Sequence, residues 1–317
     1  MATPRVVIGA PLYNQAGPLR EALRSLLAQT FTDFRLVLID DRSTDDTVAV
    51  VRELADERVE LHVNERRLGM LANTNRAYEL ARGGEFFALG SDHDIWAPQW
   101  LERLVAALDA NAGAVLAYPR TRRMDAAGET VAGSWNFSTE GVTDPKERLR
   151  RSLARMVSGD MIYGLFRASA LDGFYAPVLA PDRLLLSELA LKGEFVQVPE
   201  LLWSRRYVNR GLLRRQRVAF WPDGDAPLRS HVPWWLAHTG EYAKAHGAVA
   251  AARDYLPASA AFQVRSRALR ATNTVVAPPV KAVLRKEPVR RVVRGRVLPL
   301  LAETRQVLER LSDEAEA

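Results

Sequence analysis

The chain has 317 residues, enough for one large domain or two smaller ones with a buried core. A hydrophobic fraction of 48% with 26% charged residues is ordinary for a globular protein. The absence of cysteine excludes disulfides, thiolate metal sites and cysteine nucleophiles. No apolar run approaches the roughly 18 to 20 residues that cross a bilayer, and the N-terminus lacks a signal-peptide pattern. We therefore expect a cytoplasmic protein, either free or bound peripherally to the cytosolic face of the plasma membrane.

The net charge of +6 is unevenly placed. Residues 205–217 contain six arginines and no acid, and residues 265–296 contain ten basic residues and one acid. This asymmetry predicts an anionic partner for the C-terminal third, such as phospholipid, lipid-linked phosphate or nucleic acid.

The first 118 residues alternate between strand and helix patterns. Apolar, often β-branched runs predict buried strands at 6–10, 34–39, 59–63, 86–89 and 114–118. Apolar residues at helical spacing predict helices over 17–29, from the capping residues 43–46 to about 55, over 70–82 and over 98–111. This alternation with short connections predicts a doubly wound α/β fold whose sheet is mostly parallel, with right-handed crossovers.

The pattern changes after residue 118. Residues 119–145 are rich in Gly, Ser, Thr and Asp, which predicts turns or irregular structure. Further elements are predicted as helices over 149–156 and 183–192 and as strands over 162–166 and 195–199. Beyond residue 225 the sequence is helical, Ala- and Arg-rich, and interrupted by prolines.

Polar side chains follow three of the predicted strands, at the sheet edge where open α/β folds bind ligands. They are Pro11, Tyr13 and Asn14, then Asp40 and Asp41, then Asp92, His93 and Asp94. A tyrosine can stack on a base there, an asparagine can hydrogen-bond backbone or ligand, and a carboxylate can accept from a base N–H or from ribose hydroxyls. Two carboxylates and an imidazole suit Mg²⁺ or Mn²⁺, which would neutralise a diphosphate. The alternatives are turn formation, helix capping and a solvated turn.

The chain resembles the family two inverting glycosyltransferases of the GT-A fold. The matching segments are Val7–Asn14, Ser25–Phe31, Leu38–Asp45, Asn64–Gly69, Asn75 and Asp92–Pro98. The match is strong over residues 5–118 and weak over 119–206. It implies a GT-A-type, Rossmann-like sheet flanked by helices, with 1–118 as the nucleotide-sugar-binding half and 119–225 as the acceptor-binding half of one catalytic domain. Residues 226–317 would form a basic helical C-terminal extension.

The resemblance also implies which residues bind the nucleotide. Pro11, Tyr13 and Asp41, or Asp40 in its place, would hold the nucleobase, and the Asp92 region would contact ribose and metal. The full nucleotide-binding set is expected to be Pro11, Tyr13, Asn14, Asp40, Asp41, Asn75 and Asp92.

The sequence departs from the family pattern at two positions. His93 stands where the family usually has its metal-binding Asp, so either His93 is itself a ligand or Asp94 takes over. Thr74 stands where an Arg often precedes the Asn matched by Asn75, which puts one phosphate contact in doubt.

Inverting transfer is a single displacement in which a base deprotonates the acceptor hydroxyl while Mn²⁺ or Mg²⁺ stabilises the departing nucleoside diphosphate. In this family the base is an acid before a helix in the second half. Asp182 is the best-placed candidate and Asp160 the second, although Asp182 could instead only cap the leucine-rich helix. Arg205 or Arg206 could bind the diphosphate or the acceptor, or could belong to an exposed basic loop.

Residues 280–311 contain an apolar helical face with arginines mainly off it. Such a helix can lie in an anionic membrane surface. It can equally pack on the catalytic domain with its arginines in water, and Pro288 and Pro299 limit each helical piece.

These features together predict an enzyme that moves a single hexosyl or deoxyhexosyl unit from a nucleoside-diphosphate-sugar to a glycan or glycolipid hydroxyl, in cell-surface polysaccharide or glycolipid synthesis. One alternative is a catalytically inactive relative acting as a scaffold, which the histidine at position 93 keeps open. Another is a basic nucleic-acid-binding protein, but the arginine clusters have little aromatic interleaving, so nucleic acid is not the expected partner. A sugar-nucleotide pyrophosphorylase would be expected to carry a Gly-rich basic loop after the first strand, and this chain has none there.

Overall fold

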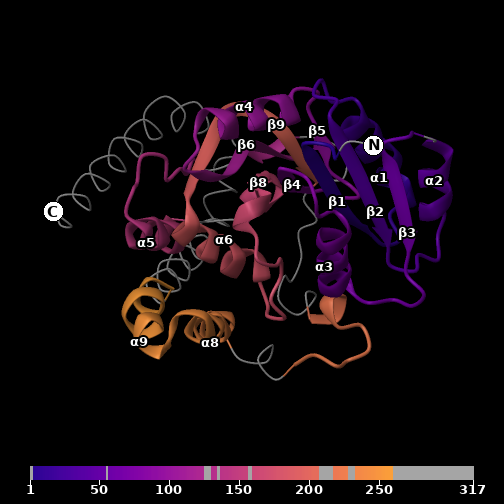
Figure 1. Cartoon of the computed structure of the whole chain (residues 1–317). Coiled ribbons are helices and arrows are strands. Elements are labelled where there is room, and N and C mark those ends of the chain that lie inside the picture. The colour runs from indigo at the N-terminus through magenta and orange to yellow at the C-terminus, as the bar shows by residue number, and fades with distance from the viewer. Residues whose placement is uncertain are drawn as a thin grey trace, which may run out of the picture. The chain divides into compact units, whose positions relative to one another are not determined.

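The computed structural model describes residues 3–54, 56–124, 130–133, 136–155, 159–206, 217–227 and 233–259. These residues form a nine-stranded sheet flanked by helices (Figure 1). One compact unit runs from Met1 to Ala260 and includes the helices beyond residue 225. The predicted boundaries at residues 118 and 225 stay predictions, and the basic segment 280–311 lies outside the described residues.

The strands are β1 (Val6–Leu12), β2 (Phe34–Asp40), β3 (Val59–Val63), β4 (Phe86–Leu89), β5 (Ile95–Trp96), β6 (Ala114–Met124), β7 (Thr130–Gly133), β8 (Leu165–Arg167) and β9 (Glu194–Arg206). The α-helices are α1 (Ala16–Leu27), α2 (Thr47–Leu54), α3 (Met70–Leu80), α4 (Trp100–Ala110), α5 (Pro145–Arg155), α6 (Pro181–Lys192), α8 (Trp234–His246) and α9 (Ala248–Ala250). Two 3₁₀ segments, η1 (Asp160–Tyr163) and η2 (Ala168–Ala170), and a π-helical segment, η4 (Ala251–Tyr255), complete the described elements.

The strands β3, β2, β1 and β4 lie side by side in that order and are parallel, as the sequence predicted. The chain places β2 and β3 on one side of β1 and then β4 on the other. The strand order therefore reverses between β1 and β4, and in open α/β sheets such a switch point marks where ligands bind, at the carboxyl ends of the strands. This topology fixes where a ligand site can form.

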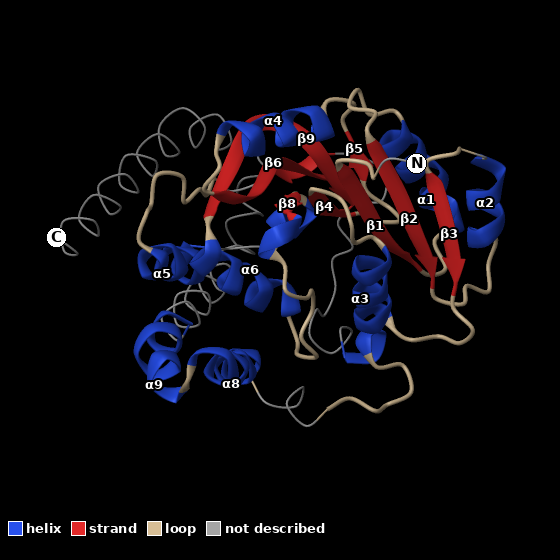
Figure 2. Ribbon diagram, viewed as in Figure 1, coloured by secondary structure: helices blue, strands red, loops and turns tan. Residues whose placement is uncertain are grey.

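Helices cover both faces of the sheet (Figure 2). On β1, Val6, Ile8 and Ala10 pack in one cluster with α1, α2 and α4, whereas Val7 faces the cluster formed with α3 and α6. Because both faces of the sheet are buried, the sequences of the central strands are continuous apolar runs rather than alternating apolar and polar residues.

The second half of the sheet is mixed. Strand β8 is antiparallel to both β4 and β6, and β6 is parallel to β9. The prediction of irregular structure from residue 119 is wrong at its start, because pairing with β9 carries β6 on to Met124. The pairing register shifts between Pro119 and Arg120, and a bulge of this kind lets a strand accommodate a proline.

Two other elements differ from the prediction. Strand β5 pairs with β9 and was not predicted, because two residues are too short to show a periodic pattern. The predicted strand over 162–166 begins instead as the 3₁₀ turn η1, and only Leu165–Arg167 form a strand.

Candidate active site

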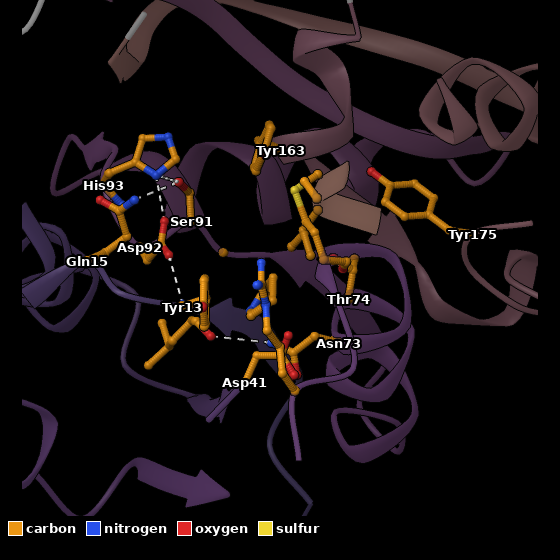
Figure 3. A pocket seen from close by; sticks show the side chains of 17 residues that line it. Tyr13, Gln15, Asp41, Asn73, Thr74, Ser91, Asp92, His93, Tyr163 and Tyr175 are labelled. Atoms are coloured by element: carbon orange, nitrogen blue, oxygen red, sulfur yellow. Dashed lines mark hydrogen bonds and ion pairs between the residues drawn. The ribbon is translucent and has the colours of Figure 1, made fainter. Parts of the chain in front are cut away.

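A cavity of about 270 Å³ lies at the carboxyl ends of the parallel strands (Figure 3). Its lining comes from the loops after β1, β2 and β4, from α3 and the loop before it, and from the second half of the chain. The lining residues are Pro11, Leu12, Tyr13, Gln15, Asp41, Arg67, Met70, Asn73, Thr74, Leu89, Gly90, Ser91, Asp92, His93, Tyr163, Tyr175 and Ala219. Five of the residues predicted for the site, Pro11, Tyr13, Asp41, Asp92 and His93, thus share one cavity.

Tyr13 forms one wall of the cavity together with Arg67. The Arg67 guanidinium lies 4.2 Å from the centroid of the Tyr13 ring, a cation–π arrangement. Its Nε is buried and has no hydrogen-bond partner among the described residues. Arg67 was not predicted, because the sequence of the loop 64–69 shows a basic pair but not which arginine turns toward the cavity.

Asp41 lines the cavity but its carboxylate also organises the loop before α3. It accepts hydrogen bonds from Asn64 Nδ2 (2.9 Å) and from the backbone N–H groups of Leu68 (2.6 Å) and Gly69 (2.8 Å). Gly69 has φ +86, and a Cβ there would lie 2.4 Å from the carbonyl oxygen of Phe220, so both conformation and space require glycine. Asp41 is 2% exposed, and any ligand contact it makes must share an oxygen with these donors.

Asp40 and Asn14 do not line the cavity. Asp40 is fully buried, and its Oδ2 accepts the Ser43 N–H (2.9 Å). Asn14 has φ +50, and its Oδ1 accepts the Thr44 N–H (2.8 Å). Asn14 therefore joins the loop after β1 to the loop after β2, and Asp40 stabilises the loop after β2 from within. Neither side chain lines the cavity.

Asn75 also lies outside the cavity lining. Its Nδ2 donates to the Tyr175 carbonyl oxygen (2.9 Å), and its Oδ1 accepts the Tyr175 N–H (2.8 Å). Tyr175 lies on the side of the cavity opposite Asp92 and His93 (Figure 3). The amide of Asn75 thus positions a wall of the site.

Asp92 and His93 form a close pair at the other end of the cavity. Asp92 Oδ1 is 2.5 Å from His93 Nδ1, and Asp92 Oδ2 accepts the Tyr13 N–H at 3.4 Å. Burial alone would lower the pKa of His93, but the hydrogen bond with Asp92 and the charges of Asp94 and Asp92 together raise it above its usual value. Asp94 is 1% exposed and accepts the Arg206 N–H (2.8 Å), so it anchors the end of β9.

Among the residues that the structure describes, no group of three or more His, Asp or Glu side chains forms a ready cation site. Asp92 and His93 both line the cavity, however: the carboxylate suits Mn²⁺ or Mg²⁺, and a neutral imidazole beside it would suit Mn²⁺ rather than Mg²⁺. Mg²⁺ is commonly held by one or two carboxylates together with substrate phosphates. The pair therefore fits a cation that a bound diphosphate would also ligate.

The two candidate bases have different surroundings. Asp160 is 7% exposed and its carboxylate receives Arg123 Nη2 (2.8 Å) and Arg205 Nη1 (2.5 Å). Asp182 is half-buried at the start of α6. Burial raises the pKa of its carboxyl, against the opposing effects of the Arg183 charge and N–H and of Arg205. A raised pKa suits a carboxylate that accepts a proton, whereas Asp160 is held by two arginines.

Neither of the two predicted arginines, Arg205 and Arg206, is in the cavity lining. Arg205 pairs with Asp160, as described above, and Arg206 Nη2 pairs with Glu21. The recorded contacts of the two guanidinium groups are thus with Asp160 and Glu21, and not with residues that line the cavity. Tyr163, Tyr175 and Ala219 line the cavity from the second half, and no local sequence pattern marks any of them as a ligand-binding residue.

The mostly parallel sheet flanked by helices, with a cavity at its switch point, is a GT-A-type fold. The model of the family described as glycosyl transferase family 2 matches residues 7–170, just over half of the chain. The chain belongs to this family.

Known proteins resemble parts of the chain. It is 31% identical over 147 residues to a PGL/p-HBAD biosynthesis glycosyltransferase of Mycobacterium bovis, covering 45% of this chain and 54% of that protein. It is 33% identical over 106 residues to UDP-Glc:alpha-D-GlcNAc-diphosphoundecaprenol beta-1,3-glucosyltransferase WfgD of Escherichia coli, covering 33% of this chain and 42% of that protein. The chain thus spans about half or less of the length of these relatives.

A solved structure resembles this chain in fold. Mannosyltransferase PcManGT from Pyrobaculum calidifontis, in complex with GDP-Man and Mn²⁺, superposes with a TM-score of 0.51 at 21% identity, covering 98% of this chain and 88% of that one. At this identity the likeness concerns the fold. Within the described residues, no helix combines the length and the apolar character that a membrane span needs.

Proposed function

We propose that the protein transfers a single sugar from a nucleoside-diphosphate-sugar to an acceptor hydroxyl with inversion at the anomeric carbon. The observation that carries the proposal is the shared cavity of Tyr13, Asp41, Asp92 and His93 at the switch point of the sheet. Two further observations support a nucleotide-sugar donor: the chain belongs to glycosyl transferase family 2, and PcManGT, which resembles it in fold, was solved in complex with GDP-Man.

The donor would lie with its base against the wall formed by Tyr13 and Arg67. A ring and a planar guanidinium both offer a flat surface for a base, and the positive charge would attract the diphosphate. A Mn²⁺ or Mg²⁺ ion held by Asp92 and His93 would offset the charge of the departing diphosphate. Tyr163 and Tyr175, farther along the cavity, would then face the sugar.

The chemical step needs a proton acceptor for the attacking hydroxyl. We assign this role to Asp182: as the acceptor oxygen bonds to the anomeric carbon, its proton passes to the Asp182 carboxylate. The bond from the anomeric carbon to the diphosphate oxygen breaks, and its electron pair leaves with the nucleoside diphosphate. The raised pKa of Asp182 supports the assignment, since it makes that carboxylate a better base than one of ordinary pKa.

The acceptor is proposed to be a growing polysaccharide or a glycolipid. The support is the name of the WfgD relative, whose own acceptor is a diphosphoundecaprenol-linked sugar. No feature of the described residues selects among such acceptors.

A thermal-shift panel tests the proposal. UDP, GDP and dTDP, and a sugar of each, are added with and without Mn²⁺; ligands that bind the folded state raise the melting temperature. At least one nucleotide is expected to raise it, and more strongly with Mn²⁺. A flat response to every combination would refute the donor site. Binding without release of nucleoside diphosphate, in the presence of extracted lipid-linked acceptors, would instead favour an inactive relative acting as a scaffold.

A further inference from the structure

The segment that carries the proposed base has an unusual backbone. Ala180 has φ 52 and ψ 50, in the left-handed region that non-glycine residues rarely occupy, and it directly precedes Pro181 at the start of α6. A residue before proline normally adopts extended backbone. Such a conformation persists only where the surrounding structure holds it. Asp182 is two residues from this corner, so whatever holds the corner also places the carboxylate.

A buried histidine from helix α8 provides that restraint. His238 is 0% exposed, and its Nε2–H donates to the carbonyl oxygen of Leu179, 2.8 Å away, immediately before Ala180. Its Nδ1 lies 3.3 Å from the hydroxyl of Tyr255, which is also fully buried. The Tyr255 hydroxyl can donate only to an Nδ1 that carries no proton, which leaves the proton on Nε2, where it faces Leu179.

The same network reaches α6 itself. The Ser187 side chain neighbours the Tyr255 hydroxyl, and Ser187 Oγ donates to the Arg183 carbonyl oxygen (2.7 Å). The Arg183 guanidinium lies 5.4 Å from the centroid of the Trp234 ring on α8. Both sides of the corner are therefore tied to the segment 233–259, beyond the residues 7–170 that the family model matches.

The Asp182 carboxylate has little room to move. A Cβ placed on Gly159 would lie 1.8 Å from Asp182 Oδ2, so the carboxylate packs directly on the backbone before η1. A shift of the corner by a fraction of an ångström would change this contact, and small misplacements of a reacting group can cost large factors in rate.

We infer that His238 is a positioning residue for the transfer reaction: through its hydrogen bond to Leu179 it fixes the left-handed corner at Ala180 and thereby places Asp182. The inference rests on the proposed role of Asp182 as base. It makes the contact between His238 and the corner at Ala180 part of the catalytic apparatus.

The test compares His238→Leu, which removes the donor, with His238→Gln, whose amide can donate in place of Nε2–H. His246→Gln, on the exposed part of the same helix, is the matched control. Hydrogen exchange of the amides in 177–186 is measured together with initial rates of nucleoside diphosphate release from the donor identified by the thermal-shift panel. His238→Leu is expected to speed exchange in 177–186 by at least about tenfold and to lower kcat by a similar factor, with the donor KM unchanged. His238→Gln should recover most of both, and His246→Gln should change neither.

The outcomes separate this inference from the proposed function. Unchanged exchange in 177–186, or a rise that is equal in β1 and α3, would overturn the positioning role, as would an unchanged kcat in His238→Leu. A wild type that turns over no donor would refute the proposed function, while the exchange data would still decide whether His238 holds the corner. If His238→Leu does not fold, Tyr255→Phe replaces it, because this variant keeps both rings and removes only the hydroxyl at Nδ1. Its kcat is then expected to fall, and a kcat equal to wild type would count against the network.

Discussion

The side-chain amide of Asn75 bonds the backbone of Tyr175 twice, once to its N–H and once to its carbonyl oxygen. The two residues are 100 positions apart in the sequence. Helix α3, in the first half of the chain, is thereby joined to the loop that supplies a wall of the cavity from the second half. An asparagine that resembles a ligand-binding residue by its sequence context thus supports the site from outside it.

Replacing Asn75 by Leu should loosen this wall. Both Tyr175 backbone groups would lose their partner, and we expect the free energy of unfolding to fall by about 1 to 3 kcal/mol. The KM for the donor should rise with it, because Tyr175 lines the cavity. Urea unfolding and donor titration measure the two effects. Asn111→Leu, at a surface loop where the amide bonds Glu194, is the control that should leave donor KM unchanged; an equal KM in Asn75→Leu would remove Tyr175 from the donor site.

Arg67 should contribute to nucleotide affinity through its stacked guanidinium. Arg67→Gln removes the charge and Arg67→Lys keeps it without the planar group, so the pair separates the two contributions. We expect Arg67→Gln to weaken nucleotide binding about 3- to 30-fold, and Arg67→Lys to recover only part of the loss. Isothermal titration with the nucleotide that stabilises the protein gives the affinities. Arg66→Gln, next along the chain and exposed, should bind like wild type. Equal affinities at both positions would contradict the stacking role.

The parallel half of the fold could be predicted because its signals are local. Each central strand is a short apolar run, each helix has its own apolar stripe, and the polar residues at the strand ends mark the ligand edge. Tyr13, Asp41 and Asp92 were placed in one cavity by this reasoning, and the structure agrees. The role of Asn14 could not be predicted from its neighbours in the sequence, because its side chain bonds a backbone N–H 30 residues away.

The remaining features depend on contacts that no local pattern encodes. The extension of β6 past Pro119 requires β9 as a partner, some 80 residues later. Tyr163 and Tyr175 come to the cavity from turns whose sequences carry no ligand-binding signal. Asp41 looks like a ligand-binding acid in the sequence, but its oxygens already receive three donors, and only the folded loop reveals them.

Asp182→Asn should abolish transfer while leaving the donor site intact. We expect kcat to fall by at least about 100-fold with an unchanged nucleotide-induced thermal shift. In the wild type, the base must be ionised, so kcat should rise with pH through the raised pKa of Asp182 and level off above it. Glu188→Gln, which alters another carboxylate of α6, should keep both rate and profile. Turnover retained in Asp182→Asn would reassign the base.

Gly159→Ala tests the contact that confines the Asp182 carboxylate. The added methyl would lie 1.8 Å from Asp182 Oδ2 and 2.9 Å from its Cγ, so the carboxylate must move. We expect kcat to fall about tenfold or more, with donor KM close to wild type. Gly173→Ala adds a methyl where no atom lies within 4 Å and should be neutral. Steady-state rates for the two variants give the comparison, and similar kcat values would show that the position of this carboxylate does not limit the reaction.

The burial of His238 should make stability depend on pH in a defined window. Burial lowers the pKa of His238 to about 4 from 6.5, partly opposed by the hydrogen bond to Leu179, while Arg183 lowers it further and Glu241 raises it. Between these two values the unfolded chain binds a proton that the folded protein excludes. This contribution to stability is therefore complete above pH 6.5 and is lost as the pH falls toward 4.

Urea unfolding at pH 7.0 and 4.5 should show wild type losing about 2 to 3 kcal/mol more than His238→Gln across this interval. His246→Gln, whose histidine is partly exposed and paired with Glu188, should keep the wild-type slope. Equal slopes for wild type and His238→Gln would mean that the imidazole can accept a proton without unfolding, and that the hydrogen bond to Leu179 is not made by a buried neutral ring.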